Sequence, residues 1–238
     1  MILLVFSFTV GWRATSAQVY IPDDDLMLHE NKLSAPSDVY GWVMEGKGVV
    51  EFEDEWMVMY SPGESGHHVY WAPYNLPSSF VASWEVQCLE KDAGLCIVFF
   101  AASGVNGEDI FDDAFPERDG KFKQYTNSKY FNNYHISYYA NTKDFRSKEV
   151  THLRKNAGFH KVQVGKSGIP TSSNEIHTVT LVKDHGIIRL LIDERTVIDW
   201  EDNGKKYGNV LGPGRLGFRQ MKWTKFRYRN LKIRKIHS

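Results

Sequence analysis

The chain has little of what marks several large classes of protein. Its 29 Lys and Arg residues are balanced by 29 Asp and Glu residues, whereas a nucleic-acid-binding protein usually carries a basic excess. Its two cysteines do not have the spacing of a zinc site. The Gly-x-Ser-x-Gly turn of hydrolases, the phosphate-binding glycine loop and the dinucleotide fingerprint are missing from the sequence. We therefore expect no nucleic-acid partner, no cofactor and no metal site.

Long apolar runs are also missing, apart from one short run at the N-terminus. Residues 2–10 are mainly apolar, but they are too few to span a bilayer, which needs about 20 residues. Small residues follow up to Ala17, as they do before a signal-peptide cleavage site, although no basic residue precedes Arg13. The sequence therefore predicts a signal peptide over residues 1–17, a periplasmic or secreted protein and no membrane span. A buried first strand is the alternative.

Residues 18–238 have the pattern of a single all-β domain. Short segments rich in β-branched and aromatic residues are separated by turn residues, and no segment has the periodicity of a helix longer than a turn or two. Residues 134–141 alternate most clearly, and residues 176–193 form a hairpin pattern. Apolar residues make up 42% of the chain, which is enough for a packed core. Together these features predict a jelly-roll sandwich of two antiparallel sheets with a concave polar groove.

The remaining strand predictions rest on shorter patterns. A change of apolar register predicts a bulge near Asn230, and the basic residues around it are typical of a solvated sheet edge. Residues 80–90 and 95–101 have the pattern of a hairpin that places Cys88 opposite Cys96, either as a disulfide or as two buried thiols. Further strands are expected at residues 49–52, 56–60, 67–71 (ended by Pro73), 120–124, 159–164, 196–200, 214–221 and 226–236.

Several blocks of residues resemble one known family. They are residues 99–104 (FFAASG), 107–112 (GEDIFD), 134–138 (YHISY), 152–160 (HLRKNAGFH) and 216–221 (LGFRQM). On these blocks, which occur in the family's order, residues 42–233 resemble the YesU-like family of bacterial saccharide-utilisation proteins. The resemblance implies a concanavalin-like jelly roll found beside enzymes that degrade uronate-containing polysaccharides, such as pectic or algal polymers. It implies a fold and a context but no particular reaction.

The polar residues of these blocks suit the elimination of a group β to a uronate carboxylate. Elimination needs a base for the acidified C5 proton, a neutraliser for the carboxylate and an acid for the leaving oxygen. His135 and Tyr139 lie on one face of a regular strand, and Arg154 and His160 follow in the next block. We therefore predict His135, Tyr139, Arg154 and His160 as catalytic residues that act without a metal.

The predicted substrate-binding residues supply hydrogen-bonding groups and a guanidinium fork, which suits a carboxylate. They are Asp109, Gln124, Tyr134, Asn156, Arg219 and Gln220. The sequence thus predicts an exported carbohydrate-active protein of polysaccharide degradation. Its reaction would be that of a carbon–oxygen lyase, either an oligosaccharide dehydratase or a polysaccharide lyase, on an acidic oligosaccharide or polysaccharide.

Two other functions fit the same sequence. A non-catalytic carbohydrate-binding module would use aromatic platforms, and 14% of the residues are aromatic, among them 7 Trp. A glycoside hydrolase needs two carboxylates about 5–10 Å apart, which Asp109 and Asp112 could supply, but their block looks like a loop. The three aspartates at residues 23–25 are either part of a calcium site or a solvated segment.

Overall fold

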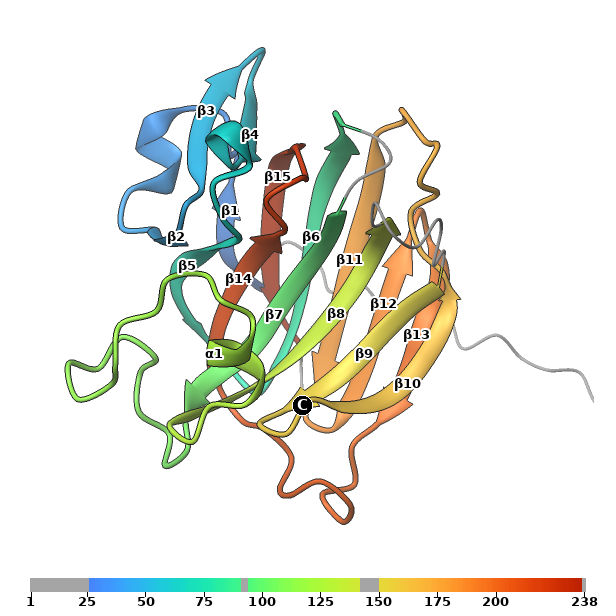
Figure 1. Cartoon of the computed structure of the whole chain (residues 1–238). Helices are drawn as coiled ribbons and strands as arrows, with labels where there is room; N and C mark the ends of the chain where they lie inside the picture. Colours follow the sequence, from blue (N-terminus) through green and yellow to red (C-terminus); the bar gives the residue numbers. More distant parts are fainter. Residues whose placement is uncertain (1–25, 91–93, 142–149, 237–238) are drawn as a thin grey trace, which may run out of the picture.

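Two antiparallel sheets, one of 8 strands and one of 7, are packed face to face (Figure 1). The structure is a computed structural model that describes residues 26–90, 94–141 and 150–236. The all-β sandwich predicted from the sequence is confirmed. The predicted signal peptide (residues 1–17) and the aspartates at residues 23–25 lie outside the described residues.

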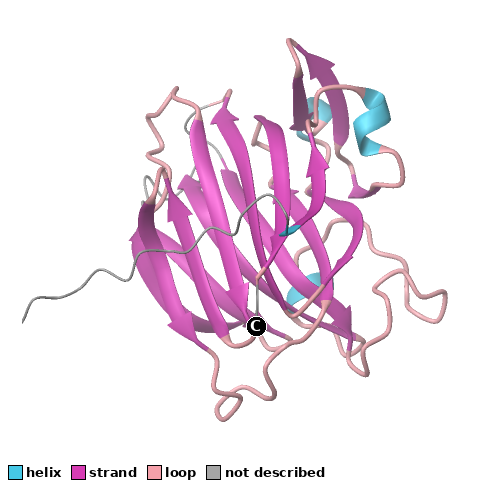
Figure 2. Cartoon of the chain, turned by 180° about the vertical axis from the view of Figure 1, so that it is seen from behind, coloured by secondary structure: helices cyan, strands magenta, loops and turns pink. Residues whose placement is uncertain are grey.

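The 8-stranded sheet has the order β13-β12-β11-β6-β15-β4-β3, and β1 also pairs with β15. Figure 2 shows this sheet from behind, with its long strands side by side. Its strands are β1 (Met27–Asn31), β3 (Val49–Glu53), β4 (Trp56–Tyr60), β6 (Ser79–Cys88), β11 (His177–Asp184), β12 (Ile187–Ile192), β13 (Arg195–Glu201) and β15 (Phe226–Lys235).

The 7-stranded sheet has the order β10-β9-β8-β7-β14-β5-β2. One helical turn, α1 (Lys123–Thr126), and the loop around it lie in front of this sheet (Figure 1). Two 3₁₀ turns, Pro36–Val39 and Pro62–Glu64, complete the described helical structure. The strands of this sheet are β2 (Val43–Gly46), β5 (His68–Leu76), β7 (Gly94–Gly104), β8 (Phe131–Asn141), β9 (Val150–Asn156), β10 (His160–Ser167) and β14 (Gly214–Gln220).

The main core lies between the sheets, because each strand turns alternate side chains toward the opposite sheet. Trp84 of β6 is central: its ring centroid lies 5.2 Å from that of Phe218 and 6.0 Å from that of Tyr138, both in the other sheet. A second apolar cluster lies on the outer face of the 7-stranded sheet, where Trp71 and Phe99 pack against Tyr125 of α1. The α1 loop therefore covers part of the face on which we predicted a polar groove.

The predicted hairpin around the two cysteines is wrong. β6 and β7 follow each other in the chain but belong to different sheets, so the chain crosses the sandwich between them. Cys88 and Cys96 both point into the main core as buried thiols. The Cys96 Sγ lies 3.0 Å from the hydroxyl oxygens of Tyr138 and Tyr228, which fixes it in a polar niche within the core.

Three other local predictions need correction. Residues 120–124 do not form a strand; they lead into α1, where Gln124 accepts a hydrogen bond from the backbone of Asp119. β5 does not end at Pro73 but continues to Leu76, because a register irregularity opposite Pro73 removes the need for its missing N–H. The basic strand β15 is not an edge, since it lies between β6 and β4.

The predicted bulge near Asn230 is confirmed. The pairing of β15 with β6 shifts register between Arg229 and Lys232, and Asn230 has a φ of 55°. The basic side chains of β15 lie on the outer face of the sheet. The guanidinium groups of Arg227 and Arg229 pack over the Trp56 ring at 4.4 and 4.1 Å.

The burial of Cys96 generates a prediction about thiol reactivity. Burial raises the pKa of the Cys96 thiol to about 12, so the reactive thiolate is scarce at neutral pH. In a Cys88→Ser variant, which leaves Cys96 as the single thiol, we expect iodoacetamide at pH 8 to modify Cys96 in denaturant but not in the native protein. Intact-mass spectrometry measures the modification. Rapid labelling of the native protein would contradict the buried placement.

Candidate functional site

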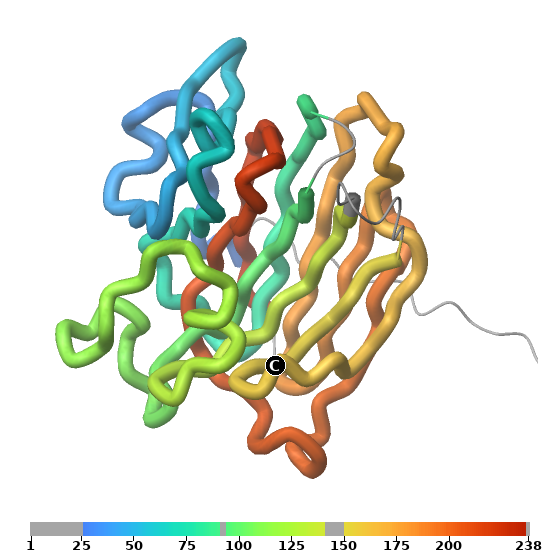
Figure 3. Tube along the Cα trace, in the orientation of Figure 1, coloured from blue at the N-terminus to red at the C-terminus, as the bar shows by residue number. Residues whose placement is uncertain are grey.

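A pocket lies at one end of the 7-stranded sheet, where five strand ends meet. β5, β7 and β9 end there and β8 and β14 begin there, because neighbouring antiparallel strands run in opposite directions. The loop after β7 and the loop of residues 202–213, at the bottom of Figure 3, form its walls. The pocket volume is about 540 Å³. This size is typical of small-ligand sites, which span roughly 300–1,000 Å³.

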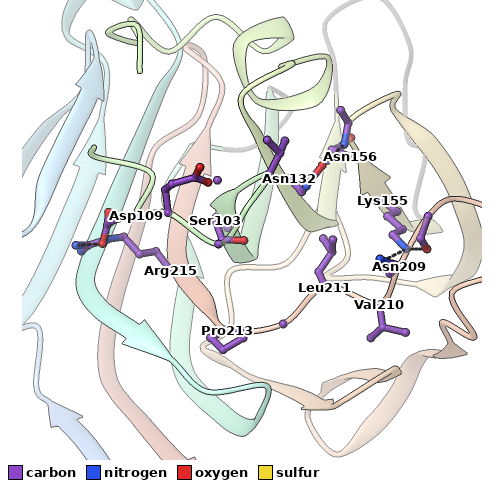
Figure 4. A pocket seen from close by; sticks show the side chains of 18 of the residues that line it. Ser103, Asp109, Asn132, Lys155, Asn156, Asn209, Val210, Leu211, Pro213 and Arg215 are labelled. Atoms are coloured by element: carbon purple, nitrogen blue, oxygen red, sulfur yellow. Dashed lines mark hydrogen bonds and ion pairs between the residues drawn. The ribbon is translucent and has the colours of Figure 1, made fainter. Parts of the chain in front are cut away.

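The lining of this strand-end pocket is mainly polar (Figure 4). Besides glycines and a few apolar residues, it contains Asn75, Ser103, Asn132, Asn156, Asn209, Glu108, Asp109, Lys155, Arg215 and Tyr207. Amides, carboxylates and cations supply both donors and acceptors. The pocket therefore suits a ligand rich in hydroxyl groups better than an apolar one.

A buried ion pair holds the 202–213 loop in place. The Lys155 Nζ donates to the Asp202 Oδ2 at 2.6 Å and to the backbone oxygens of Gly208 and Asn209 at 2.7 Å each. The Tyr134 hydroxyl donates to the same Asp202 oxygen and accepts from the Leu211 N–H. Tyr134, predicted to bind substrate, is therefore a buried residue that supports the pocket wall from behind.

Asp109 and Arg215 form an ion pair on the pocket wall. The Arg215 Nε lies 2.9 Å from the Asp109 Oδ1, and its Nη2 lies 2.7 Å from Oδ2, so the pair is bidentate. Burial raises the pKa of Asp109, but hydrogen bonds from Arg215 and from the Phe111 backbone outweigh it, and the net pKa lies below the ordinary value. Asp109 therefore carries a negative charge at neutral pH and acts as an oriented acceptor.

Asn156 connects the pocket to His135. The Asn156 Nδ2 donates to the Asn133 Oδ1 at 2.7 Å and to the His135 Nδ1 at 2.8 Å. Because an amide nitrogen only donates, His135 Nδ1 is the acceptor and the neutral ring carries its proton on Nε2. Burial first, and then the charges of Arg154 and Arg219, keep the pKa of His135 well below its ordinary value.

His135 itself does not reach solvent. It is 1% exposed, and the rings of Phe99, Phe122 and Phe159 surround it at centroid distances of 5.3, 5.4 and 6.0 Å. Asn156 is also buried, at 2% exposed, and its Oδ1 has no hydrogen-bond partner among the described residues. Asn156 lines the pocket and is therefore the member of this hydrogen-bonded chain that lies nearest to the pocket space.

His160 and Tyr207 form an aromatic pair beside the pocket. Their rings are stacked at a centroid distance of 4.4 Å and an angle of 21°, and Tyr207 lines the pocket. The Lys206 Nζ lies 5.0 Å from the Tyr207 ring centroid. The 202–213 loop thus presents an aromatic face next to a cation.

Tyr139 and His135 do not share a face as predicted. The pairing of β7 with β8 shifts register at Tyr138, because Cys96 pairs with Tyr139 and Ile97 with Ser137. This bulge turns both Tyr138 and Tyr139 into the main core, where Tyr139 packs against Phe226.

The other predicted residues lie away from the pocket. Arg154 stays on the outer face of β9, stacked 3.7 Å over the Phe159 ring. Arg219 is buried under the α1 loop, where it donates to the Gly120 oxygen and packs on Phe122. Gln220 points into the core toward the Tyr228 hydroxyl, and Gln124 caps the turn before α1.

The ten predicted residues thus separate into groups. Asp109 and Asn156 line the pocket, and His160 stacks on its Tyr207. His135 and Tyr134 lie behind its wall, and the remaining five lie elsewhere.

Sequence reasoning missed Tyr207, Arg215 and Lys155. Arg215 lies within a predicted strand, residues 214–221, to which only Arg219 and Gln220 were assigned a role. Lys155 lies in the block of residues 152–160, from which Arg154, Asn156 and His160 were predicted instead. Tyr207 lies in the glycine-rich stretch 202–214, which had no strand pattern. An aromatic residue in a long loop between strands is a signal of function that could have found it.

Among the described residues, no three His, Cys, Asp or Glu side chains come together as ligands for a metal ion. None of the described helices has the length and apolar character of a membrane span.

The fold defines this protein as a lectin-like β-sandwich of the galectin and concanavalin type. The chain belongs to the family described as domain of unknown function DUF1961, which matches residues 26–233. It is 35% identical to the uncharacterized protein YesU of Bacillus subtilis (strain 168) over 212 residues, which is 87% of this chain and 94% of the relative. The predicted resemblance to the YesU-like family is confirmed.

Solved structures that share the fold include the following three. A protein of unknown function with a galectin-like fold from Bacillus subtilis has a TM-score of 0.82 at 33% identity, covering 88% of this chain and 96% of the other. The carbohydrate-binding module CBM66 from Bacillus subtilis has 0.55 at 16% identity, covering 82% and 96%. A putative glycosyl hydrolase from Parabacteroides distasonis has 0.53 at 12%, covering 83% and 89%. The last two similarities concern the fold alone.

The buried ion pair generates a stability prediction. Replacing Lys155 by Met leaves the Asp202 carboxylate buried without its cation, which typically costs about 3–5 kcal/mol. We expect Lys155→Met to lower the free energy of unfolding by about that amount in urea titrations. Lys161→Met, at an exposed lysine of β10, is the matched control and should change little. A loss below about 1 kcal/mol for Lys155→Met would show that the pair is not a structural anchor.

The same pair gives stability a pH dependence. Burial raises the pKa of Asp202, but hydrogen bonds from Lys155 and Tyr134 outweigh it, so the folded pKa lies below the ordinary value. A lowered folded pKa stabilises the protein above the unfolded pKa of about 3.9, and this contribution is lost as pH falls through the folded pKa. We expect the stability difference between wild type and Asp202→Asn to be constant above about pH 5 and to shrink in more acidic urea titrations. A difference that grew on acidification would have the wrong sign.

Proposed function

We propose that the protein binds an acidic oligosaccharide in the strand-end pocket, as a carbohydrate-active domain of polysaccharide degradation. The observation that carries the proposal is the lining itself: the Asp109–Arg215 pair and the amides of Asn132 and Asn156 surround a pocket with one aromatic side chain, Tyr207. Sugar recognition uses this combination, because hydroxyl groups need donors and acceptors while the C–H face of a pyranose packs on an aromatic ring.

Asp109 and Asn156 offer acceptors for sugar hydroxyl groups. The Asp109 side chain is 40% exposed, so its carboxylate can still accept a hydrogen bond while Arg215 holds its orientation. The Asn156 Oδ1 has no partner among the described residues, but it is buried, so a ligand hydroxyl reaches it only when the side chain turns toward the pocket. A buried acceptor without a partner is costly, so a ligand hydroxyl there is favoured.

One cation beside the pocket favours an acidic sugar. Arg215 lies on the pocket wall but is already paired with Asp109, whereas Lys206 lies beside the Tyr207 ring. A uronate that packs on Tyr207 would bring its carboxylate within reach of Lys206, and a cation near a carboxylate adds both affinity and orientation. The fold shared with a carbohydrate-binding module and with a putative glycosyl hydrolase is compatible with either binding or catalysis.

Elimination on the bound uronate is the second candidate function, and the His160–Tyr207 pair is what favours it. The Tyr207 phenol and the His160 imidazole, whose ring centroids lie 4.4 Å apart beside the pocket, can act as acid and base. Lys206, beside the Tyr207 ring, would neutralise the carboxylate. This scheme keeps His160 from the set predicted on the sequence and replaces Tyr139 by Tyr207. Catalytic roles for His135, Tyr139 and Arg154 stay predictions, as does export of the protein.

Binding is tested by titrating the protein with uronate oligosaccharides in a calorimeter. We expect Tyr207→Ala to weaken binding about 5–10-fold, since an aromatic contact contributes about 1–1.4 kcal/mol. Tyr40→Ala, at a tyrosine that is 90% exposed, is the matched control and should bind as the wild type does. Equal affinity of the Tyr207→Ala and Tyr40→Ala variants would remove the pocket from the proposal.

Turnover is tested on the same oligosaccharides by mass spectrometry. Loss of one water mass indicates dehydration, new unsaturated fragments indicate depolymerisation, and unchanged masses with measurable affinity indicate binding alone. Under elimination, His160→Gln should retain affinity and lose turnover. No binding and no change with any acidic glycan would overturn the proposed function.

A further inference from the structure

A serine, a histidine and an aspartate form a hydrogen-bonded chain at the end of the sandwich opposite the pocket. The Ser173 Oγ lies 2.7 Å from the His177 Nε2, and the His177 Nδ1 lies 2.6 Å from the Asp193 Oδ2. Ser173 lies in the loop between β10 and β11, His177 begins β11, and Asp193 follows β12. The β10–β11 loop lies at the top of Figure 1, and the 202–213 loop, which lines the pocket, lies at the bottom.

The hydrogen bonds fix the direction of each proton. A carboxylate only accepts, so the His177 Nδ1 carries the proton and donates to Asp193. When the ring is neutral, its Nε2 is the acceptor and the Ser173 hydroxyl donates to it. This is the arrangement in which a histidine can remove the proton of a serine nucleophile.

Backbone contacts hold the outer members of the chain. The Asp193 Oδ1 accepts from the Thr178 N–H at 2.9 Å, which orients the carboxylate toward His177. The Ser173 Oγ accepts from the Glu175 N–H at 3.1 Å, which leaves its own proton for His177. The Gln87 Nε2 of β6 donates to the Asn174 oxygen and ties the loop to the sheet.

The members differ in exposure in a way that suits a surface reaction. His177 is 8% exposed, whereas Ser173 is partly exposed at the loop surface, where a substrate can approach it. Ile176, three residues further on, is 44% exposed and offers a small apolar surface for a short acyl group. The Asp193 side chain is 51% exposed, so its carboxylate orients His177 but is partly screened by water.

We propose that Ser173, His177 and Asp193 form an esterase site for esters of short carboxylic acids. The Ser173 Oγ bonds to the ester carbonyl carbon as its proton passes to the His177 Nε2. The carbon–oxygen bond to the alcohol then breaks, and the alcohol leaves with the proton from His177, so that an acyl-serine remains. Water then attacks the acyl carbon as its proton passes to the His177 Nε2. The bond from this carbon to the Ser173 Oγ breaks, His177 returns the proton to the Oγ, and the carboxylic acid leaves.

Hydrolysis of p-nitrophenyl acetate tests the site on the whole protein. We expect Ser173→Ala and His177→Gln to reduce hydrolysis to the rate in protein-free buffer. Asp193→Asn should reduce it about tenfold, less than a buried triad aspartate would, because the Asp193 carboxylate is half exposed. Ser172→Ala, at the exposed neighbouring serine, is the matched control and should keep the full rate.

Covalent labelling separates a nucleophile from a structural serine. A fluorophosphonate should attach to Ser173 of the wild type and of Ser172→Ala, as located by peptide mass spectrometry, and should not attach in His177→Gln. Thermal melting of each variant shows whether it is folded. The labelling of Ser173 in the wild-type protein does not depend on whether the variants fold. Equal hydrolysis by wild type and Ser173→Ala, or no phosphonate on Ser173, would overturn the proposal.

Discussion

Each sheet has to bury one face against the other, and the rest of the structure depends on this constraint. β6 and β7 are adjacent in the chain but lie in opposite sheets, and both supply inward-facing side chains to the shared core. The bulge at Tyr138 adds two successive tyrosines to the same core. Since the space between the sheets is filled mainly by apolar side chains, the groups that could meet a polar ligand lie at the strand ends and on the outer faces.

The Lys155–Asp202 pair is an exception that supports this division. It lies at the border between core and pocket, where a buried charge is tolerated because Lys155 has three acceptors and Asp202 has three donors. The pair fastens the loop that carries Tyr207 to the end of β9. A loop of this length without secondary structure needs such an anchor to present a pocket wall in one conformation.

The two ends of the sandwich carry different chemistry. At one end, amides, the Asp109–Arg215 ion pair and an aromatic ring line a pocket. At the other end, a serine, a histidine and an aspartate form a hydrogen-bonded chain. In both places the strands fix the ends of loops, and the loops supply the groups that meet a ligand. Antiparallel order makes this possible, because it returns alternate strands to the same edge.

The sequence by itself determined the fold class, the family, most strand positions and two residues of the pocket, Asp109 and Asn156. These follow from local alternation, turn residues and blocks of contiguous residues, which are properties of short segments. Tertiary structure alone decided which strands pair, that the hairpin around the cysteines is a crossing, that a bulge turns Tyr139 inward, and that His135 is enclosed by three aromatic rings. It also brought Tyr207 and Arg215 to the lining of one pocket, and it connected Ser173 to Asp193 through His177. The reason is physical: a side chain's exposure and partners depend on contacts between segments distant in the chain, and a local pattern does not encode which segments meet.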